Sequence, residues 1–382
     1  MPPAKTSFFL FGPRGVGKTT WVKSNYPKAV YVDLLDSKTF NQLFTNPSRI
    51  EEKIPKDFTD WVVIDEIQKA PELLNEVHRL IEGKHYKFIL TGSSARKLRR
   101  GGINLLAGRA LVYYMHPLTA VEIGESFSLT DCVKYGCLPS IFDHEDRDSY
   151  LASYIQAYLQ QEVVQEGISR NISAFARFLE TASFSQGSVL NMSEVAREAA
   201  VGRRMAEDYF CALEDLLVGL RLPVFSKRAK RKLVSHSKFY YFDVGVYRAI
   251  RPISPFDQPE MIGGIAFESL FMQNLRAIND YLKLNYNLYY FRTLAGVEVD
   301  FVAYGPKGIV AFEVKSKREI FSGDLVGLKT FQQDYPMAKC YMIYGGEQKM
   351  YFGNIEAVPF VDAIKNLPDL LTRSTKFGLR SA

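Results

Sequence analysis

The sequence predicts an α/β protein whose first domain is built on a parallel sheet. Short apolar runs at 7–11, 61–64 and 87–90 have the length and composition of buried strands, and a glycine-rich loop directly follows the first of them. The length of 382 residues suggests two or three domains at roughly 150 residues each. With 47% hydrophobic and 24% charged residues, the chain can bury several cores, which excludes wholesale disorder.

Charge and cysteine usage say less about function. The formal net charge of +6 comes from 48 basic and 42 acidic residues and is a weak argument for a polyanionic partner. Four scattered cysteines, none at zinc spacing, argue against a disulfide framework and favour a reducing cytosol. No apolar stretch reaches the ~18 residues of a membrane span, and no basic-then-apolar leader opens the chain. We therefore expect a cytoplasmic protein without a membrane span.

The loop after the first predicted strand has the G-x-x-x-x-G-K-T form of a phosphate-binding loop. Its glycines permit close approach of backbone N–H groups to phosphate oxygens, and the helix expected near Lys18 directs its positive end at the same anion. We expect Lys18 to reach the β- and γ-phosphates of ATP, and the hydroxyl of Thr19 to bind Mg²⁺. The alternative is a chance glycine turn. The predicted nucleotide-binding residues here are Gly12, Pro13, Arg14, Gly15, Val16, Gly17, Lys18, Thr19 and Thr20.

Two carboxylates, Asp65 and Glu66, follow the second apolar run in a Walker B pattern. A parallel strand delivers its C-terminal residues to the crevice where a ligand lies. We expect Asp65 to hold Mg²⁺ through its water shell and Glu66 to orient or deprotonate the attacking water; two solvated acids are the alternative. The third run ends in a turn in which Thr91 or Ser93 can contact the γ-phosphate or the water, or simply cap a helix.

An arginine precedes a further strand expected at 110–115. Arg109 can stabilise γ-phosphate charge, in cis or from a neighbouring subunit. An ordinary surface salt bridge is the alternative.

These motifs together resemble the AAA+-like P-loop ATPases of bacteria and archaea that carry a restriction-endonuclease-like C-terminal part. The resemblance rests on the Asp-Glu-Ile-Gln continuation at 65–68, the Thr-Gly-Ser-Ser turn at 91–94, and the stretches 106–109 (Leu-Ala-Gly-Arg) and 117–122 (Pro-Leu-Thr-Ala-Val-Glu). It covers nearly the whole chain, and the downstream combination is more specific than the P-loop. The resemblance implies ATP and Mg²⁺ as cofactors. Because AAA+-like sites often lie between subunits, it also leaves a homo-oligomer open.

The middle of the chain is predicted to be helical, with a helix-turn-helix outline near residue 200. Ser193 is expected to cap the first helix, and a glycine-containing turn separates it from the second. Two strand-like segments joined by a basic run complete the outline of a winged helix. The expected elements are helices at 194–199 and 203–217 and strands at 222–225 and 238–243.

Much of the positive excess lies within this outline. Between Arg221 and Lys238 there are seven Lys or Arg residues and no acid. We expect contacts to the phosphate backbone of DNA from the basic run and the start of the second helix. A solvated hairpin, or a winged helix that binds protein, is the alternative. The predicted DNA-contacting residues are Arg203, Arg204, Lys227, Arg228, Lys230, Arg231 and Lys232.

The last third predicts two strands that bring acidic residues beside a lysine. Strand side chains alternate, so Glu298 and Asp300 share one face, and so do Glu313 and Lys315 on the next strand. Two carboxylates can hold Mg²⁺, and a lysine can orient or activate water.

This constellation resembles the PD-(D/E)XK restriction-endonuclease-like fold. The matching positions are Glu268 on a leading helix, Asp300 on the second strand and Glu313-x-Lys315 on the third, with Val299 where the motif has proline. In the Holliday-junction-resolvase-like branch all four would be active-site residues. The resemblance thus implies Glu268, Asp300 and Glu313 as metal ligands, and Asp300, Glu313 and Lys315 as catalytic residues. A relic held by ion pairs is the alternative, and the role of Glu298 is left open.

Three functions follow as hypotheses. The first is a Mg²⁺-dependent ATPase acting on DNA, with Lys18, Glu66 and Arg109 as catalytic residues and with DNA cleavage as an added activity. The second is a nuclease regulated by ATP. The third is a nucleotide-controlled switch or scaffold, like STAND-type signalling ATPases, with an inactive nuclease-like domain. The expected domains are an AAA+-like ATPase at 1–116, a helical extension at 117–189, a winged helix at 190–258 and a restriction-endonuclease-like α/β domain at 259–382.

Overall fold

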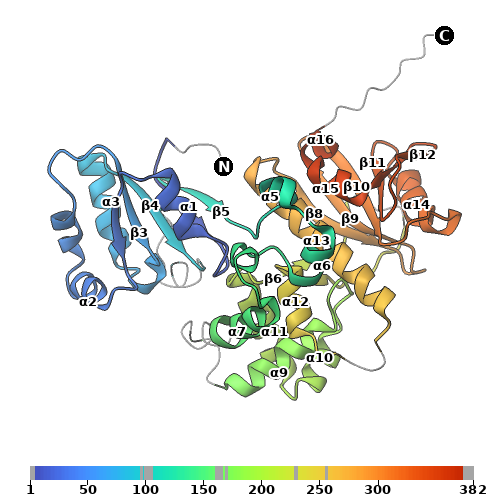
Figure 1. Ribbon diagram of the computed structural model, residues 1–382, viewed down its shortest axis with the longest axis horizontal. Coiled ribbons are helices and arrows are strands. Elements are labelled where there is room, and N and C mark those ends of the chain that lie inside the picture. Colours follow the sequence, from blue (N-terminus) through green and yellow to red (C-terminus); the bar gives the residue numbers. More distant parts are fainter. Residues whose placement is uncertain are drawn as a thin grey trace, which may run out of the picture.

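The computed structural model describes residues 5–94, 98, 106–159, 167, 171–227, 231–253 and 257–372. Figure 1 shows a blue N-terminal α/β unit on one side, an orange and red C-terminal unit on the other, and green helices of the middle segment beside both. In the described part of the chain, no helix combines the length and the apolar character needed to cross a bilayer. None of the four cysteines forms a disulfide.

The N-terminal sheet is parallel, as the sequence predicts, with strand order β2-β3-β4-β1-β5. Both faces are covered, which explains the continuous apolar runs. Phe8 and Leu10 face the side of α1, whereas Phe9 and Phe11 face α2 and α3. The elements are β1 (Phe8–Phe11), α1 (Lys18–Asn25), β2 (Val30–Asp33), α2 (Ser37–Thr45), η1 (Pro47–Lys53), β3 (Trp61–Asp65), η2 (Ile67–Lys69), α3 (Leu73–Lys84), β4 (Lys87–Gly92), η3 (Leu106–Gly108) and β5 (Leu111–Tyr114).

The segment after β5 is helical where the structure describes it, in agreement with the prediction for 117–189. One helix, α7, continues without a break into a π-helix, η6. The elements are α5 (Ala120–Ile123), η4 (Gly124–Ser126), α6 (Leu129–Tyr135), η5 (Pro139–Phe142), α7 (Arg147–Ser153), η6 (Tyr154–Leu159) and α9 (Ile172–Ser183).

Two helices and an antiparallel strand pair follow in the predicted order. They are α10 (Met192–Glu198), α11 (Arg203–Asp215), β6 (Gly219–Leu222) and β7 (Lys238–Tyr241). The predicted cap is wrong, because Asn191 rather than Ser193 precedes the first turn and accepts the backbone N–H of Glu194 at 3.3 Å.

The connection between β6 and β7, predicted as the basic hairpin of a wing, packs against the C-terminal unit. Phe225 is fully buried against Phe331 and Tyr335 of the C-terminal unit. Its backbone N–H donates to the carbonyl oxygen of Tyr290 at 2.7 Å, and Leu233 pairs with Thr293. One apolar ring within a basic run thus holds the connection along the edge of the C-terminal sheet.

The C-terminal sheet is mixed, with order β12-β13-β11-β10-β9-β8. Helix α13 packs on one face through Leu270 and Phe271, and α14 on the other through Leu328 and Phe331. The elements are α12 (Val244–Ile250), α13 (Pro259–Tyr281), β8 (Asn287–Arg292), β9 (Glu298–Gly305), β10 (Gly308–Lys315), η7 (Ser322–Leu325), α14 (Val326–Asp334), β11 (Lys339–Tyr344), β12 (Met350–Phe352), β13 (Ile355–Pro359), α15 (Phe360–Lys365) and α16 (Leu367–Thr372).

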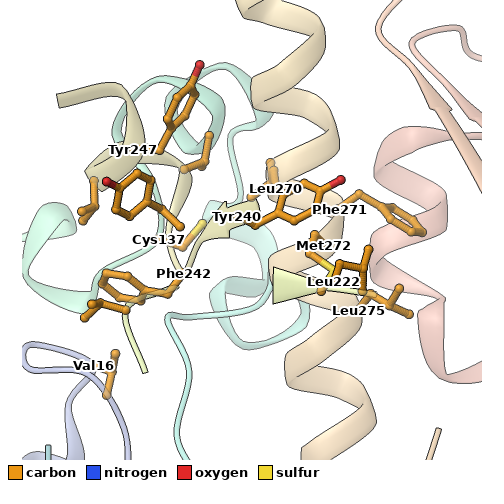
Figure 2. Close-up of a cluster of buried hydrophobic side chains, with 14 of the residues drawn as sticks. Val16, Cys137, Leu222, Tyr240, Phe242, Tyr247, Leu270, Phe271, Met272 and Leu275 are labelled. Carbon is orange, nitrogen blue, oxygen red and sulfur yellow. The ribbon is translucent and has the colours of Figure 1, made fainter. Parts of the chain in front are cut away.

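One apolar core joins these parts. Figure 2 shows Val16 of the glycine loop at one end, Phe242 and Cys137 beyond it, and Leu270 and Phe271 of α13 at the far side. The glycine loop is therefore packed against the rest of the chain rather than standing alone on its sheet.

Candidate functional site

The glycine loop bends from β1 into α1 through backbone conformations that favour glycine. Gly15 and Gly17 have φ angles of 82° and 88°, and a Cβ on Gly12 would clash with the carbonyl oxygen of Met115. The N-terminus of α1 therefore faces the loop, where its unpaired N–H groups favour an anion. Lys18 is buried, and its Nζ donates to the carbonyl oxygens of Gly12 at 2.7 Å and Pro13 at 3.0 Å.

Asp65 ends β3 beside this loop and is only 4% exposed. Its Oδ2 accepts hydrogen bonds from the hydroxyls of Thr19, at 2.9 Å, and Tyr31, and its Oδ1 accepts one from the hydroxyl of Thr91. Of the two residues considered at the end of β4, Thr91 thus contacts the carboxylate directly. A hydroxyl and a carboxylate side by side are hard oxygen ligands, so Thr19 and Asp65 fit Mg²⁺.

Glu66 occupies the left-handed region with φ 61°, a conformation that costs a non-glycine residue about 1 kcal/mol or more. The amide nitrogen of Gln68 donates both to the carboxylate of Glu66 and to the hydroxyl of Ser93, the latter at 3.0 Å. A Cβ on Gly92 would lie 2.5 Å from Gln68 Oε1. The motif continuation contained Gln68, but its link between Glu66 and Ser93 was not predicted.

A pocket of about 630 Å³ opens between the glycine loop and later parts of the chain, a volume suited to a small-molecule ligand. Residues 14–20 and Glu66 line one side, and His116, Pro139 and Tyr281 line the other. The N–H of His116 donates to the Tyr281 hydroxyl at 3.0 Å, and His116 Nε2 lies 2.7 Å from Asp280 Oδ2. Burial lowers the pKa of His116. The C-terminal end of α13 is thereby fastened to the end of β5.

The loop is also supported from outside by Tyr154, the first residue of the π-helix. Its hydroxyl donates to the carbonyl oxygen of Arg14 at 2.8 Å, and a Cβ on Gly15 would lie 3.2 Å from its ring. Tyr154 is buried. Its contact with the glycine loop gives the π-helix a position at the candidate site, where such helices are frequent.

Arg109 does not line this pocket. Its guanidinium pairs with the carboxylate of Glu82 on α3. This contact is the surface salt bridge that was the alternative for Arg109. That Arg109 stabilises the γ-phosphate in a neighbouring subunit stays a prediction.

The acidic residues of the C-terminal unit come together as predicted from strand alternation. Asp300 Oδ2 accepts the N–H of Val314 at 2.8 Å, which brings it beside both Glu313 and Lys315. Lys315 Nζ lies 2.6 Å from Glu313 Oε1. Burial raises the pKa of Glu313 to about 8, with Asp300 as the next contributor.

The group at the centre of this cluster, Lys238 of β7, was missed. Its Nζ lies 3.2 Å from Glu268 Oε1, 2.5 Å from Glu298 Oε1 and 3.6 Å from Asp300 Oδ1, and the residue is only 2% exposed. The Tyr240 hydroxyl also donates to Glu268. The sequence did contain a signal for this contact. Side chains alternate along a strand, which places Lys238 and Tyr240 on the same face of β7.

This geometry does not fit the metal site predicted from Glu268, Asp300 and Glu313. Carboxylate oxygens converge on the ammonium of Lys238, which repels a second cation. Across the described residues, no three His, Cys, Asp or Glu side chains are arranged to hold one metal ion by themselves. The catalytic roles of Asp300, Glu313 and Lys315 stay predictions.

The basic stretch is partly neutralised within the chain. Arg221 pairs with Glu207 and Glu214, and Arg231 Nε lies 2.9 Å from Asp334 Oδ2. The remaining members of the predicted DNA-contacting set are exposed where the structure describes them, namely Arg203, Arg204, Lys227 and Lys232, whereas Arg228 and Lys230 lie outside the described residues.

Comparison with known proteins agrees with the P-loop geometry. Residues 4–124 match the family model of the AAA domain. The chain carries an AAA-type P-loop domain at its N-terminus. Residues 127–257 match a domain of unknown function, DUF8612, and residues 263–362 match another, DUF4143. The AAA match indicates nucleotide binding and ATPase-type activity.

Two curated mycobacterial proteins are similar over most of the chain. They are the uncharacterized proteins Rv2008c of Mycobacterium tuberculosis and Mb2031c of Mycobacterium bovis. Each is 26% identical over 308 residues, which cover 78% of this chain and 68% of the relative. Their names assign no activity.

Proposed function

We propose that this protein is a Mg²⁺-dependent ATPase whose reaction takes place in the pocket between the glycine loop and α13. The observation that carries the proposal is the hydrogen bond from Thr19 to Asp65, which joins the helix after the loop to the end of β3. Beside it, Lys18 lies inside the loop. A loop, a lysine, a hydroxyl and a buried carboxylate are the parts that phosphoryl transfer from ATP requires.

Each side chain has a separate task. The loop N–H groups and Lys18 bind the phosphates, and Lys18 exchanges its two carbonyl partners for phosphate oxygens. Thr19 and Asp65 hold Mg²⁺, which when bound neutralises charge that develops on the phosphoryl group. Glu66 lines the pocket and orients the attacking water.

The test is ATP turnover with and without Mg²⁺ in the full chain, its Lys18→Ala variant and its Glu66→Gln variant. We expect Lys18→Ala to lose ATP binding and turnover, and Glu66→Gln to lose about 10²-fold or more in kcat while still binding ATP. Lys38→Ala on the exposed face of α2 is the matched control. Unchanged turnover in Lys18→Ala would contradict the proposal.

DNA is the polyanion that we propose as the partner of this ATPase. Arg203 and Arg204 lie exposed in the first turn of α11, the second helix of the helix-turn-helix outline. We expect ATP turnover to rise with duplex, single-stranded or branched DNA. The double Arg203→Ala/Arg204→Ala variant should bind DNA more weakly, with a salt slope lower by about 2. Absence of binding even at low salt would exclude this partner.

A nucleotide-controlled switch without nuclease activity is the second candidate, and the position of Lys238 among the carboxylates favours it over DNA cleavage. It predicts slow turnover without DNA stimulation, and an oligomeric state that changes between ATP and ADP. ATPase rates with several forms of DNA, together with light scattering in each nucleotide, separate the two functions. Mg²⁺-dependent cleavage that disappears in Asp300→Ala would contradict the switch without nuclease activity.

A further inference from the structure

The acidic cluster is built from parts of the chain that lie on different elements. Glu268 comes from α13, Glu298 and Asp300 come from β9, and the cation comes from β7. Lys238 is therefore the contribution of the segment that precedes the C-terminal unit.

Most of the charge of the cluster is neutralised by cations of the chain itself. Glu268, Glu298, Asp300 and Glu313 supply four carboxyl groups. Two cations besides Lys238 contact them: Arg292 Nη1 lies 2.9 Å from Glu298 Oε2, and Lys315 contacts Glu313. Three cations of the chain therefore face four carboxyl groups, and these contacts neutralise most of the negative charge within the chain.

Several of the oxygens that a metal would use already accept hydrogen bonds. Asp300 Oδ2 accepts a backbone N–H, and both Lys238 and Tyr240 donate to Glu268 Oε1. Glu313 Oε2 is buried without a hydrogen-bond partner among the described residues. A Mg²⁺ ion bound there through one or two carboxylates and water would still lie beside the ammonium of Lys238, which repels it.

We propose that Lys238 is the resident cation of this carboxylate cluster: its ammonium takes the place of a divalent ion between Glu268, Glu298 and Asp300. The contact closes the cluster to metal and fastens β7 to α13 and β9. The cluster is thus an ionic joint between the helix-turn-helix segment and the C-terminal unit.

The joint is reinforced by polar contacts next to it. Gln186 is buried, accepts the N–H of Tyr241 at 2.8 Å and donates to the hydroxyl of Ser269 at 2.8 Å. Since Tyr241 lies on β7 and Ser269 on α13, this side chain bridges the same two elements as Lys238. Removing one partner of a buried ion pair leaves the other charge uncompensated, so the joint holds only while Lys238 is present.

The test measures Mn²⁺ binding to the full chain without nucleotide. The electron paramagnetic resonance signal of free Mn²⁺ reports how much of the ion stays unbound. All variants carry Asp65→Asn, which removes the other candidate metal carboxylate. The chain with Lys238 intact should bind no Mn²⁺ at the cluster, and adding Asp300→Asn should change nothing. Lys238→Ala should gain one Mn²⁺ site per chain, with affinity raised about a hundredfold, the order expected when one positive charge a few ångströms from the ion is removed. Asp300→Asn should abolish that new site.

Two controls decide the remaining outcomes. Lys238→Arg keeps the charge and should stay closed to Mn²⁺, and the exposed Lys307→Ala in the same unit should behave like the parent. A parent chain that binds Mn²⁺ through Asp300 overturns the proposal, as does a folded Lys238→Ala variant that gains no site. If Lys238→Ala does not fold, the comparison of the parent with its Asp300→Asn variant tests the proposal. Equal Mn²⁺ binding by these two chains supports it, and a Mn²⁺ site that is lost with Asp300 overturns it.

Discussion

Asp243 should make folding stability fall as the pH rises. This carboxyl precedes α12, two residues after the end of β7, and is fully buried. Its Oδ2 accepts the N–H of Cys137 at 2.8 Å, and its Oδ1 accepts the N–H of Val246 at 3.0 Å. A Cβ on Gly136 would clash with it. Burial raises its pKa from 3.8 to about 6.

The size of the effect follows from these two pKa values. Below pH 3.8 the carboxyl is protonated in both the folded and the unfolded chain, so it has no differential effect. Between 3.8 and about 6 the folded chain holds a proton that the unfolded chain has lost, so stability decreases as the pH rises. Above the folded pKa the full penalty of about 3 kcal/mol applies. Between about pH 5 and about pH 7.5, the titration of Asp243 alone should lower the free energy of unfolding by about 1.4 kcal/mol.

Urea unfolding of the full chain and of Asp243→Asn at both pH values measures this contribution of Asp243 to the free energy of unfolding. Asn keeps an acceptor oxygen but does not titrate, so the comparison removes the contributions of other groups. The unfolding free energy of the parent should fall by about 1.4 kcal/mol more than that of the variant between the two pH values. An equal pH dependence of the two chains, or a parent that gains stability relative to the variant, would refute the argument.

Two further predictions concern the nucleotide pocket. Tyr154→Phe removes the hydrogen bond to the Arg14 carbonyl but keeps the ring, so the Kd for ATP should rise about fivefold, the equivalent of ~1 kcal/mol. Isothermal titration calorimetry measures this Kd, with Tyr351→Phe on an exposed strand as the control. An unchanged Kd in Tyr154→Phe would show that Tyr154 does not support the nucleotide loop. Gln68→Ala should lower kcat by about tenfold or more, part of the ~10²–10⁴-fold supplied by a positioned base, with little change in ATP Kd. Steady-state kinetics with separate Kd measurements tests this; a change in Kd alone would show that Gln68 does not position Glu66.

The nucleotide site was predictable because its chemistry is local in sequence. Glycine torsions, a lysine at the start of a helix and a carboxylate at the end of a parallel strand each follow from a few neighbouring residues. Alternation along β9 likewise placed Glu298 and Asp300 on one face, and both do contact Lys238. What alternation could not supply was the identity of the group opposite them.

The remaining features depend on contacts between distant residues. In the sequence, Lys238 is the last residue of a basic stretch. A count of charges along the chain does not show that carboxylates on other elements contact it. Phe225 shows the same limit, since one buried ring turned a predicted wing into a docked connection. The far wall of the pocket was equally hidden, because Tyr281 lies 165 positions from His116.

These contacts bear on where the chain divides into independent units. The DUF4143 match begins at residue 263, after Lys238, whereas the three carboxylates around this lysine lie within the match. A unit cut at that boundary would bury three acids without their cation, which favours either unfolding or capture of a metal ion. The residue that follows the strand of Lys238 is Phe242, whose ring centroid lies 6.5 Å from that of Tyr154 beside the glycine loop. The C-terminal unit is therefore electrostatically complete only together with β7, and β7 in turn leads to the elements that support the nucleotide loop.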